Sequence, residues 1–330
     1  MILQPAAETK SILSLSTIYG FRANNRGLRT FVLGDDISIR INAVIAALQT
    51  AGVFYPPTAG QKLALEKIFY QLCNLSRAPI TLVFVFDGSG RPSIKRGTRV
   101  IARPLWLIEH LKKMITSFGF YFYDAPGEAE AELAQLNAEG RIDGILTEDS
   151  DAFVFGARLV IRTLGPSVEH NSILYSADSI ENTDAVSLDR EGLLLCILLL
   201  GGEYDAGVPG VGPKIARALA LLGFGHDLVN ILDNFTGGQL NWQIIVWRNR
   251  LREELRTNAR GRLGQRQPRL AERIPDSFPS LRVADLYLNP VTSASPQHIG
   301  PMPGFNSWRP QEPNIFGLSS LCSFLFGGNG

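Results

Sequence analysis

The stretch ITLVFVFDG, residues 80–88, is a continuous run of apolar and β-branched residues that ends in an aspartate and a glycine. Such a run, closed by a turn signal, is typical of a strand buried on both faces of a parallel sheet. Two further segments have the same character and also run into acidic residues, RTFVLGD (29–35) and RIDGILTED (141–149). These three segments predict buried strands that each finish in an aspartate.

Helix-prone segments alternate with the predicted strands. We predict helices at 37–52, 60–76, 100–119 and 128–140, and shorter strands at 120–127 and 159–165. This alternation favours an α/β fold, with a mostly parallel central sheet flanked by helices on both faces. The chain turns helical over 189–235, around a Gly/Pro-rich interruption. We therefore expect a core over 1–188, a helical subdomain over 189–275 and a partly loop-like extension over 276–330.

The composition excludes several classes of protein. Hydrophobic residues make up 45% of the 330 residues, which suffices for a core, and no apolar stretch reaches the length of a membrane span. The N-terminus lacks the pattern of a secretory signal. Cys73, Cys196 and Cys322 lie far apart, which predicts reduced thiols in an intracellular protein. A net charge of +1 does not by itself indicate a nucleic-acid partner.

Acidic residues follow the predicted strands at Asp36, Asp87, Asp149 and Asp151, and Glu128 and Glu130 open the helix at 128–140. Ligands of open parallel sheets bind outside the carboxyl ends of the strands, so these acids are expected to share one edge. A cluster of carboxylates needs cations to neutralise it, and oxygen-only ligands suit Mg²⁺ or Mn²⁺. The alternative, for any single residue, is a helix cap or a surface acid.

Two other features indicate contacts with a nucleic acid. In GVPGVGPKIARALALLGFG (207–225), Gly210 and Gly212 allow a tight turn whose backbone N–H groups can meet a phosphate. The alternative is a loop between two core helices. Nine arginines stand against three glutamates between residues 241 and 273. They either follow a duplex backbone or form the outer face of an amphipathic helix, and both can hold at once.

Four segments together resemble the XPG/flap-endonuclease family of structure-selective nucleases: APGEAEAELAQL (125–136), TEDSDAFVFG (147–156), FVFDG (84–88) and GVPGVGPKIA (207–216). The KRG that follows FVFDG and the segment 207–225 are most similar to the Holliday-junction-resolvase branch of that family in fungi. The resemblance covers about residues 29–235. It implies a PIN-like nuclease core joined to a helix-hairpin-helix subdomain.

The resemblance implies a set of metal ligands, and with them two Mg²⁺ ions, or Mn²⁺ as an alternative. The implied ligands are Asp36, Asp87, Glu128, Glu130, Asp149, Asp151, Glu203 and Asp205. In GGEYDAG the family's last aspartate is replaced by Glu203, which is one methylene longer, with Asp205 close enough to compensate. The family's Met-Gly opening is also missing, since the chain starts MILQPAAETK. An aberrant start or a diverged paralogue is the expected explanation.

The resemblance also assigns basic and hairpin residues. Lys95, Arg96 and Arg99 match the catalytic arch that contacts the scissile phosphate, with the spacing one residue out of step. Gly210, Gly212 and Lys214 match the DNA-binding hairpin, where the family can also hold a K⁺ ion. The implied partner is branched DNA and no membrane. Because resolution of a four-way junction needs two incisions, symmetry predicts a protein that is a monomer alone and a dimer on junction DNA.

The resulting prediction is a Mg²⁺-dependent endonuclease of the nucleus that cleaves 5′ flaps or Holliday junctions in DNA repair or recombination and leaves 5′ phosphates. Two other readings stay open. One is a junction-binding protein of the same family whose catalysis is weakened, as Glu203 suggests. The other is an RNA-directed nuclease, which the hairpin motif disfavours.

Overall fold

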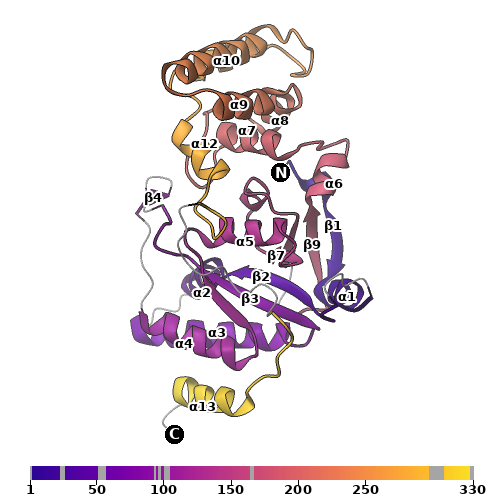
Figure 1. Ribbon diagram of the computed structural model, residues 1–330, viewed down its shortest axis with the longest axis vertical. Helices are drawn as coiled ribbons and strands as arrows, with labels where there is room; N and C mark the ends of the chain where they lie inside the picture. The colour runs from indigo at the N-terminus through magenta and orange to yellow at the C-terminus, as the bar shows by residue number, and fades with distance from the viewer. Residues whose placement is uncertain are drawn as a thin grey trace.

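Seven strands form one sheet in the computed structural model, which describes residues 2–22, 27–50, 57–92, 94–95, 98–99, 105–163, 167–296 and 308–327 (Figure 1). The sheet order is β1-β9-β8-β7-β2-β3-β6, and the five strands from β8 to β6 are parallel. Their bounds are β1 Glu8–Ser11, β2 Phe31–Asp36, β3 Ile80–Phe86, β6 Tyr121–Asp124, β7 Gly144–Leu146, β8 Leu159–Thr163 and β9 Asn171–Ser176. The predicted mostly parallel sheet is confirmed.

Two strands were not predicted from the sequence. β9 pairs antiparallel with β8, and β1 pairs antiparallel with β9, so both extend one side of the sheet. β1 has no buried residue, β9 mixes exposed and buried positions, and both include polar residues, unlike the continuous apolar runs of the central strands. A separate two-stranded element, β4 (Ile94–Lys95) with β5 (Thr98–Arg99), follows β3.

Helices cover both faces of the sheet, as predicted. One core contains α2 (Ile37–Thr50), α3 (Pro57–Leu75), α4 (Leu105–Ser117) and α13 (Ile315–Phe326), and the other contains α5 (Ala129–Ala138). Successive strand residues point to opposite faces. Val32 therefore packs into the core of α5, while Leu33 packs into the core of α3 and α4. Every residue of β2 and β3 is buried because both faces are covered.

Four helices form a second unit at the far end of the molecule from α13 (Figure 1). They are α7 (Arg190–Leu200), α8 (Pro213–Leu221), α9 (Phe224–Asn234) and α10 (Gly237–Thr257). The indole of Trp247, buried inside this unit, donates to the carbonyl of Phe224 at 3.0 Å. Among the described residues no single helix is long and apolar enough to cross a membrane, and α8 with α9 reaches that length only as a pair bent by 62°.

The remaining elements connect these layers. They are η1 Gln4–Ala6, α1 Ile12–Thr17, η2 Ile18–Arg22, η3 Asp151–Phe153, α6 Ala177–Asn182, α11 Pro268–Arg273 and α12 Leu281–Leu288. Helix α12 lies between the four-helix unit and the sheet, and it contacts α7 (Figure 1). The C-terminal part of the chain thus returns to the core. The last two residues of the helix predicted at 37–52 and the first five of the helix predicted at 100–119 lie outside the described residues.

Candidate metal centre and DNA-binding hairpin

The acidic residues meet at one edge because β7, β2 and β3 are neighbouring parallel strands (Figure 1). Asp36 is the last residue of β2, and Asp87 comes directly after β3. Asp149 follows β7 by three residues, and Asp151 starts η3. Parallel strands place their carboxyl ends on the same side of the sheet, so three distant segments deliver carboxylates to one edge.

Hydrogen bonds join these strand ends to one another. The two carboxylate oxygens of Asp87 accept from the Ser38 hydroxyl at 3.1 Å and from the Ala129 N–H at 3.0 Å. Asp87 therefore bridges the start of α2 and the start of α5. Asp151 Oδ2 accepts from the backbone N–H of Glu203 at 3.3 Å, which brings the segment after α7 to the same place.

Burial, and after it mutual repulsion, raises the pKa values of the cluster. Burial, with the nearby Asp87 carboxylate, raises the pKa of Asp36 to about 8. Burial, followed by the charge of Asp149, raises the pKa of Asp151 to about 6. The pKa of Glu130 is raised well above its usual range, first by burial and then by Asp149 and Glu203. Several carboxylates therefore compete for protons at neutral pH, which is the condition that a bound cation relieves.

The chemistry of the donor set fits a hard divalent cation. Oxygen Oε1 of Glu130 is buried and accepts no hydrogen bond from the described residues. A buried carboxylate oxygen without a donor is costly, and a metal ion is one way to satisfy it. The charged groups that act on Glu130 are all carboxylates, which Mg²⁺ and Mn²⁺ prefer over the nitrogen and sulfur ligands of zinc sites.

Glu203 and Asp205 take different positions. Glu203 is close enough to act on the pKa of Glu130, so its carboxylate belongs to the cluster despite the longer side chain. The Asp205 side chain instead accepts a hydrogen bond from the Gly207 N–H at 3.2 Å, within its own turn. Asp205 therefore supports the loop that leads to α8, and we do not place it among the groups that face Glu130.

Two tyrosines that the sequence reasoning missed hold the carboxylates. The Tyr204 hydroxyl donates to Glu128 Oε2, and the Tyr287 hydroxyl donates to Asp151 Oδ2 at 2.7 Å. Tyr204 could have been found from its place between Glu203 and Asp205. No local sequence pattern marks Tyr287, because 136 residues separate it from its partner Asp151.

The basic residues expected near the scissile phosphate are only partly described. Lys95 lies in β4 and Arg99 in β5, whose backbones pair antiparallel, while Arg96 lies outside the described residues. Among the side chains that the structure describes, that of Arg91 forms an ion pair with Asp87 Oδ2 at 3.0 Å. A cation close to the carboxylates can stabilise charge on a bound phosphate.

The hairpin has the geometry that its glycines predicted. Gly210 has a φ of +93°, in the left-handed region that favours glycine, and Gly212 is the N-cap of α8 with Pro213 in the first turn. A Cβ on Gly210 would lie 2.5 Å from Nη1 of Arg273, so this guanidinium stands directly beside the turn. Lys214, in the first turn of α8, is exposed.

Some arginines of the arginine-rich stretch (residues 241–273) bind other parts of the protein, and others are exposed near the hairpin. Arg248, Arg252 and Arg260 donate to the carbonyls of Phe278, Ile274 and Leu222, and Arg250 and Arg256 form ion pairs with Asp227 and Glu253. Arg248 is buried, so the expectation that the arginines form the outer face of the helix is wrong for this residue. The exposed arginines near the hairpin are Arg262, Arg266, Arg269 and Arg273.

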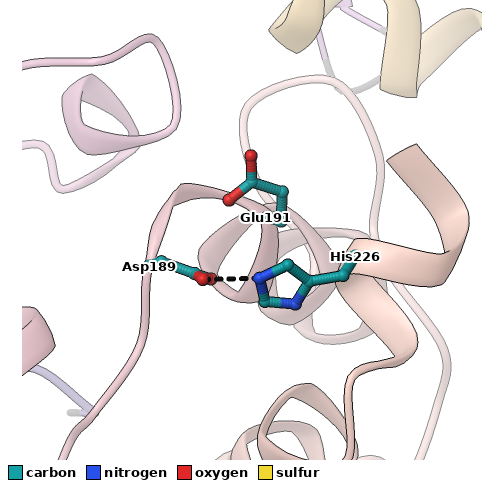
Figure 2. Close-up of side chains that lie close together, drawn as sticks. All are labelled: Asp189, Glu191 and His226. Carbon is teal, nitrogen blue, oxygen red and sulfur yellow. Dashed lines mark ion pairs between the residues drawn. The ribbon is translucent and has the colours of Figure 1, made fainter. Parts of the chain in front are cut away.

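A second group of metal-ligand types lies elsewhere, in Asp189, Glu191 and His226 (Figure 2). Asp189 Oδ2 pairs with His226 Nε2 at 2.7 Å, and Asp189 Oδ1 accepts from the Gly192 N–H as the N-cap of α7. Helices α7 and α9 both begin here, and helix N-termini favour anions over cations. Capping explains the carboxylates, so this group is not our candidate metal centre.

Comparison with known proteins finds matches for this chain. Residues 119–203 match the family model of the XPG I-region. The mouse Flap endonuclease GEN homolog 1 is 32% identical over 189 residues, which are 51% of this chain and 21% of that protein. The chain spans about a fifth of the length of the first curated relatives that it matches.

Solved structures match nearly the whole chain. The Holliday junction-resolving enzyme GEN1 in complex with product DNA and Mg²⁺ aligns with a TM-score of 0.72 and 29% identity, over 99% of this chain and 72% of that chain. The eukaryotic junction-resolving enzyme GEN-1 binding with potassium aligns with the same TM-score, identity and coverage.

Proposed function

Because the chain belongs to the XPG/flap-endonuclease family, we propose that it is a divalent-metal-dependent, structure-selective endonuclease of branched DNA. The observation that carries this proposal is the convergence of seven carboxylates from five separate segments on one sheet edge, beside a DNA-binding type of hairpin. The seven are Asp36, Asp87, Glu128, Glu130, Asp149, Asp151 and Glu203. A cap or surface role for each acid separately does not account for their grouping, with Asp36, Glu128, Glu130 and Asp151 buried.

The seven carboxylates would hold two Mg²⁺ ions, or Mn²⁺ in their place. Such a pair, when bound, supplies an activated water and stabilises the leaving oxygen of a phosphodiester. The protein groups orient the ligands: Asp87 ties α2 to α5, and Tyr204 fixes Glu128. Arg91, with Lys95, Arg96 and Arg99, would stabilise the charge of the scissile phosphate. Cleavage on the 3′-oxygen side, which leaves a 5′ phosphate, is part of the proposal.

The first test is incision of 5′-flap, four-way-junction and linear duplex DNA with Mg²⁺, with Ca²⁺ and with EDTA. We expect Mg²⁺-dependent cuts at the branch point, 5′-phosphate ends, and little cutting of the linear duplex. Ca²⁺ should support binding without efficient incision, because it tolerates irregular geometry that Mg²⁺ does not. Binding of the branched substrates without any incision in Mg²⁺ or Mn²⁺ would leave only the second reading, a junction-binding protein with a weakened site. Preferential cleavage of RNA would favour the third reading.

The hairpin and the nearby arginines would bind the duplex phosphates, with Gly210 and Gly212 presenting backbone groups and Lys214 a side-chain charge. A K⁺ ion on the turn carbonyls is part of this proposal, supported by the potassium-binding relative. We expect Lys214→Gln and Arg273→Gln each to weaken binding of all branched substrates alike. Each should also reduce the slope of log K against log salt by about one, because each removes one phosphate contact.

The matched control for these two variants is Arg77→Gln. Arg77 is an exposed arginine that pairs with Glu169 and lies just before β3, at the opposite edge of the sheet from the carboxylates. Fluorescence anisotropy over a series of KCl concentrations gives the slope of log K against log salt for each variant. If Lys214→Gln and Arg273→Gln keep the slope of Arg77→Gln, the hairpin does not bind the phosphates.

Resolution of a four-way junction requires two incisions, so we propose that a monomer assembles as a dimer on junction DNA. Gel filtration with light scattering, with and without junction DNA, measures the stoichiometry directly, and a persistent single-copy complex would contradict the dimer. We also propose that the protein acts in the nucleus, where the repair and recombination substrates of such an enzyme are found.

A further inference from the structure

Tyr287 is the part of the C-terminal segment that enters the carboxylate cluster. It lies in α12, outside the region that matches the XPG I-region, and its side chain is completely buried. Its ring packs 5.3 Å from the ring of Phe155 and 4.8 Å from the ring of Tyr204. These contacts fix the ring, so the hydroxyl has one defined position.

The hydroxyl makes two hydrogen bonds that together join two acidic segments. It donates to Asp151 Oδ2 at 2.7 Å and accepts from the backbone N–H of Glu203 at 3.1 Å. The same N–H also approaches Asp151 Oδ2 at 3.3 Å, so the three groups form a closed triangle. Because a phenol has one proton to donate, that proton is committed to Asp151.

Gly202 makes room for this triangle. A Cβ at position 202 would lie 2.4 Å from the Tyr287 hydroxyl oxygen and 2.6 Å from Cγ2 of Ile197, distances that real Cβ atoms do not reach. It would also lie 3.1 Å from Asp151 Oδ2, which is a tight contact. The φ of Gly202 is not in the left-handed region, so the absence of a side chain, and not the backbone conformation, explains why a glycine fits here.

We propose that Tyr287 is a positioning residue of the metal centre, which holds the Asp151 carboxylate and the peptide of Glu203 in one fixed arrangement. The inference rests on the proposed function and extends it, because it makes α12 a required part of the site. Mg²⁺ demands near-ideal octahedral geometry, so a carboxylate that can rotate is a poorer ligand than one held by a hydrogen bond. Loss of such an outer partner typically costs about 10- to 100-fold in metal affinity or activity.

The test is Tyr287→Phe, which keeps the packed ring and removes only the hydroxyl. We expect Mn²⁺ binding to the DNA-free protein, measured by calorimetry, to weaken by about tenfold or more. The Mg²⁺ concentration for half-maximal incision should rise by a similar factor, while affinity for branched DNA in Ca²⁺ stays unchanged. The matched control is Tyr121→Phe, which removes a hydroxyl that donates to the Arg309 carbonyl at 3.0 Å, away from the cluster.

A second variant, Gly202→Ala, tests the same idea without changing Tyr287. Its methyl group would press on both the phenol oxygen and the Ile197 side chain, so metal affinity should fall as in Tyr287→Phe. Thermal unfolding checks that both variants are folded. Metal affinity in both variants equal to that of Tyr121→Phe would overturn the positioning role and leave the proposed function intact. Failure of the unaltered protein to bind Mn²⁺ and to incise DNA would overturn the proposed function, and the positioning role with it.

Discussion

Replacement of Glu130 by glutamine should lower the rate of incision roughly a thousandfold, since a metal ligand contributes several kcal/mol of transition-state stabilisation and each 1.4 kcal/mol is about tenfold. The affinity for branched DNA, measured in Ca²⁺, should change little, because Glu130 is buried and the proposed phosphate contacts lie in the hairpin. Single-turnover kinetics at saturating Mg²⁺ measures the rate without interference from product release.

The same substitution should stabilise the metal-free protein. Glu130 faces the like charges of Asp149, Glu203 and Asp151, and its raised pKa records that repulsion together with burial. Glutamine has almost the same shape, carries no charge, and its amide can donate to the neighbouring carboxylates. We therefore expect a higher melting temperature in EDTA than for the unaltered protein. Loss of activity combined with gain of stability is typical of a site built for a ligand rather than for the fold.

The matched control is Glu139→Gln, at the end of the same helix. Glu139 accepts from Arg141 and Gln135, and these contacts lower the pKa of its carboxyl. Removing that charge should leave incision unchanged and reduce stability slightly, the opposite of the Glu130 result. Incision by Glu130→Gln within about tenfold of the unaltered protein would show that Glu130 does not hold the catalytic metal.

The sequence predicted the strand ends and missed the groups that hold them, for a physical reason. A buried parallel strand leaves a continuous apolar run, so the ends of β2, β3 and β7, and with them Asp36 and Asp87, were visible locally. Successive side chains of β2 point to opposite faces of the sheet, which separates the adjacent Asp35 and Asp36. Asp36 joins the cluster, whereas Asp35 pairs with Arg40 beneath it.

Contacts between distant segments leave no local pattern. Tyr287 looks like one more apolar residue of an amphipathic helix, and only the return of the chain to the core gives its hydroxyl a role. The same holds for the arginines of α10. Their charges suggest a DNA-facing surface, but Arg248 and Arg252 donate hydrogen bonds to carbonyls of the segment after α11. Local composition predicts which charges exist, and tertiary contacts decide which remain available to a ligand.

The stability of the metal-free protein should fall as the pH rises from about 4 to about 8. Asp36, with a pKa of about 8, and Asp151, with a pKa of about 6, bind protons more tightly in the folded state than in the unfolded chain, where an aspartate titrates near 3.9. A group whose folded pKa is raised contributes its full stability below the unfolded value and loses it as the pH passes the folded value. The loss should continue through pH 6 for Asp151 and to about pH 8 for Asp36.

Urea unfolding in EDTA at pH 5, 6, 7 and 8 measures how the free energy of unfolding changes with pH. Most proteins are most stable between pH 5 and 8, so a steady decline over this range would be distinctive. One unit of pKa shift corresponds to about 1.4 kcal/mol, so a decline of several kcal/mol is expected. Carboxyl groups whose pKa is lowered, such as Glu139 and Asp276, act only at more acidic pH and do not mask it. Saturating Mg²⁺ should remove most of the decline, because the ion binds the ionised carboxylates of the folded state alone. Asp36→Asn should flatten the slope in EDTA, and a stability that stays constant or rises from pH 5 to pH 8 without metal would contradict the repulsive cluster.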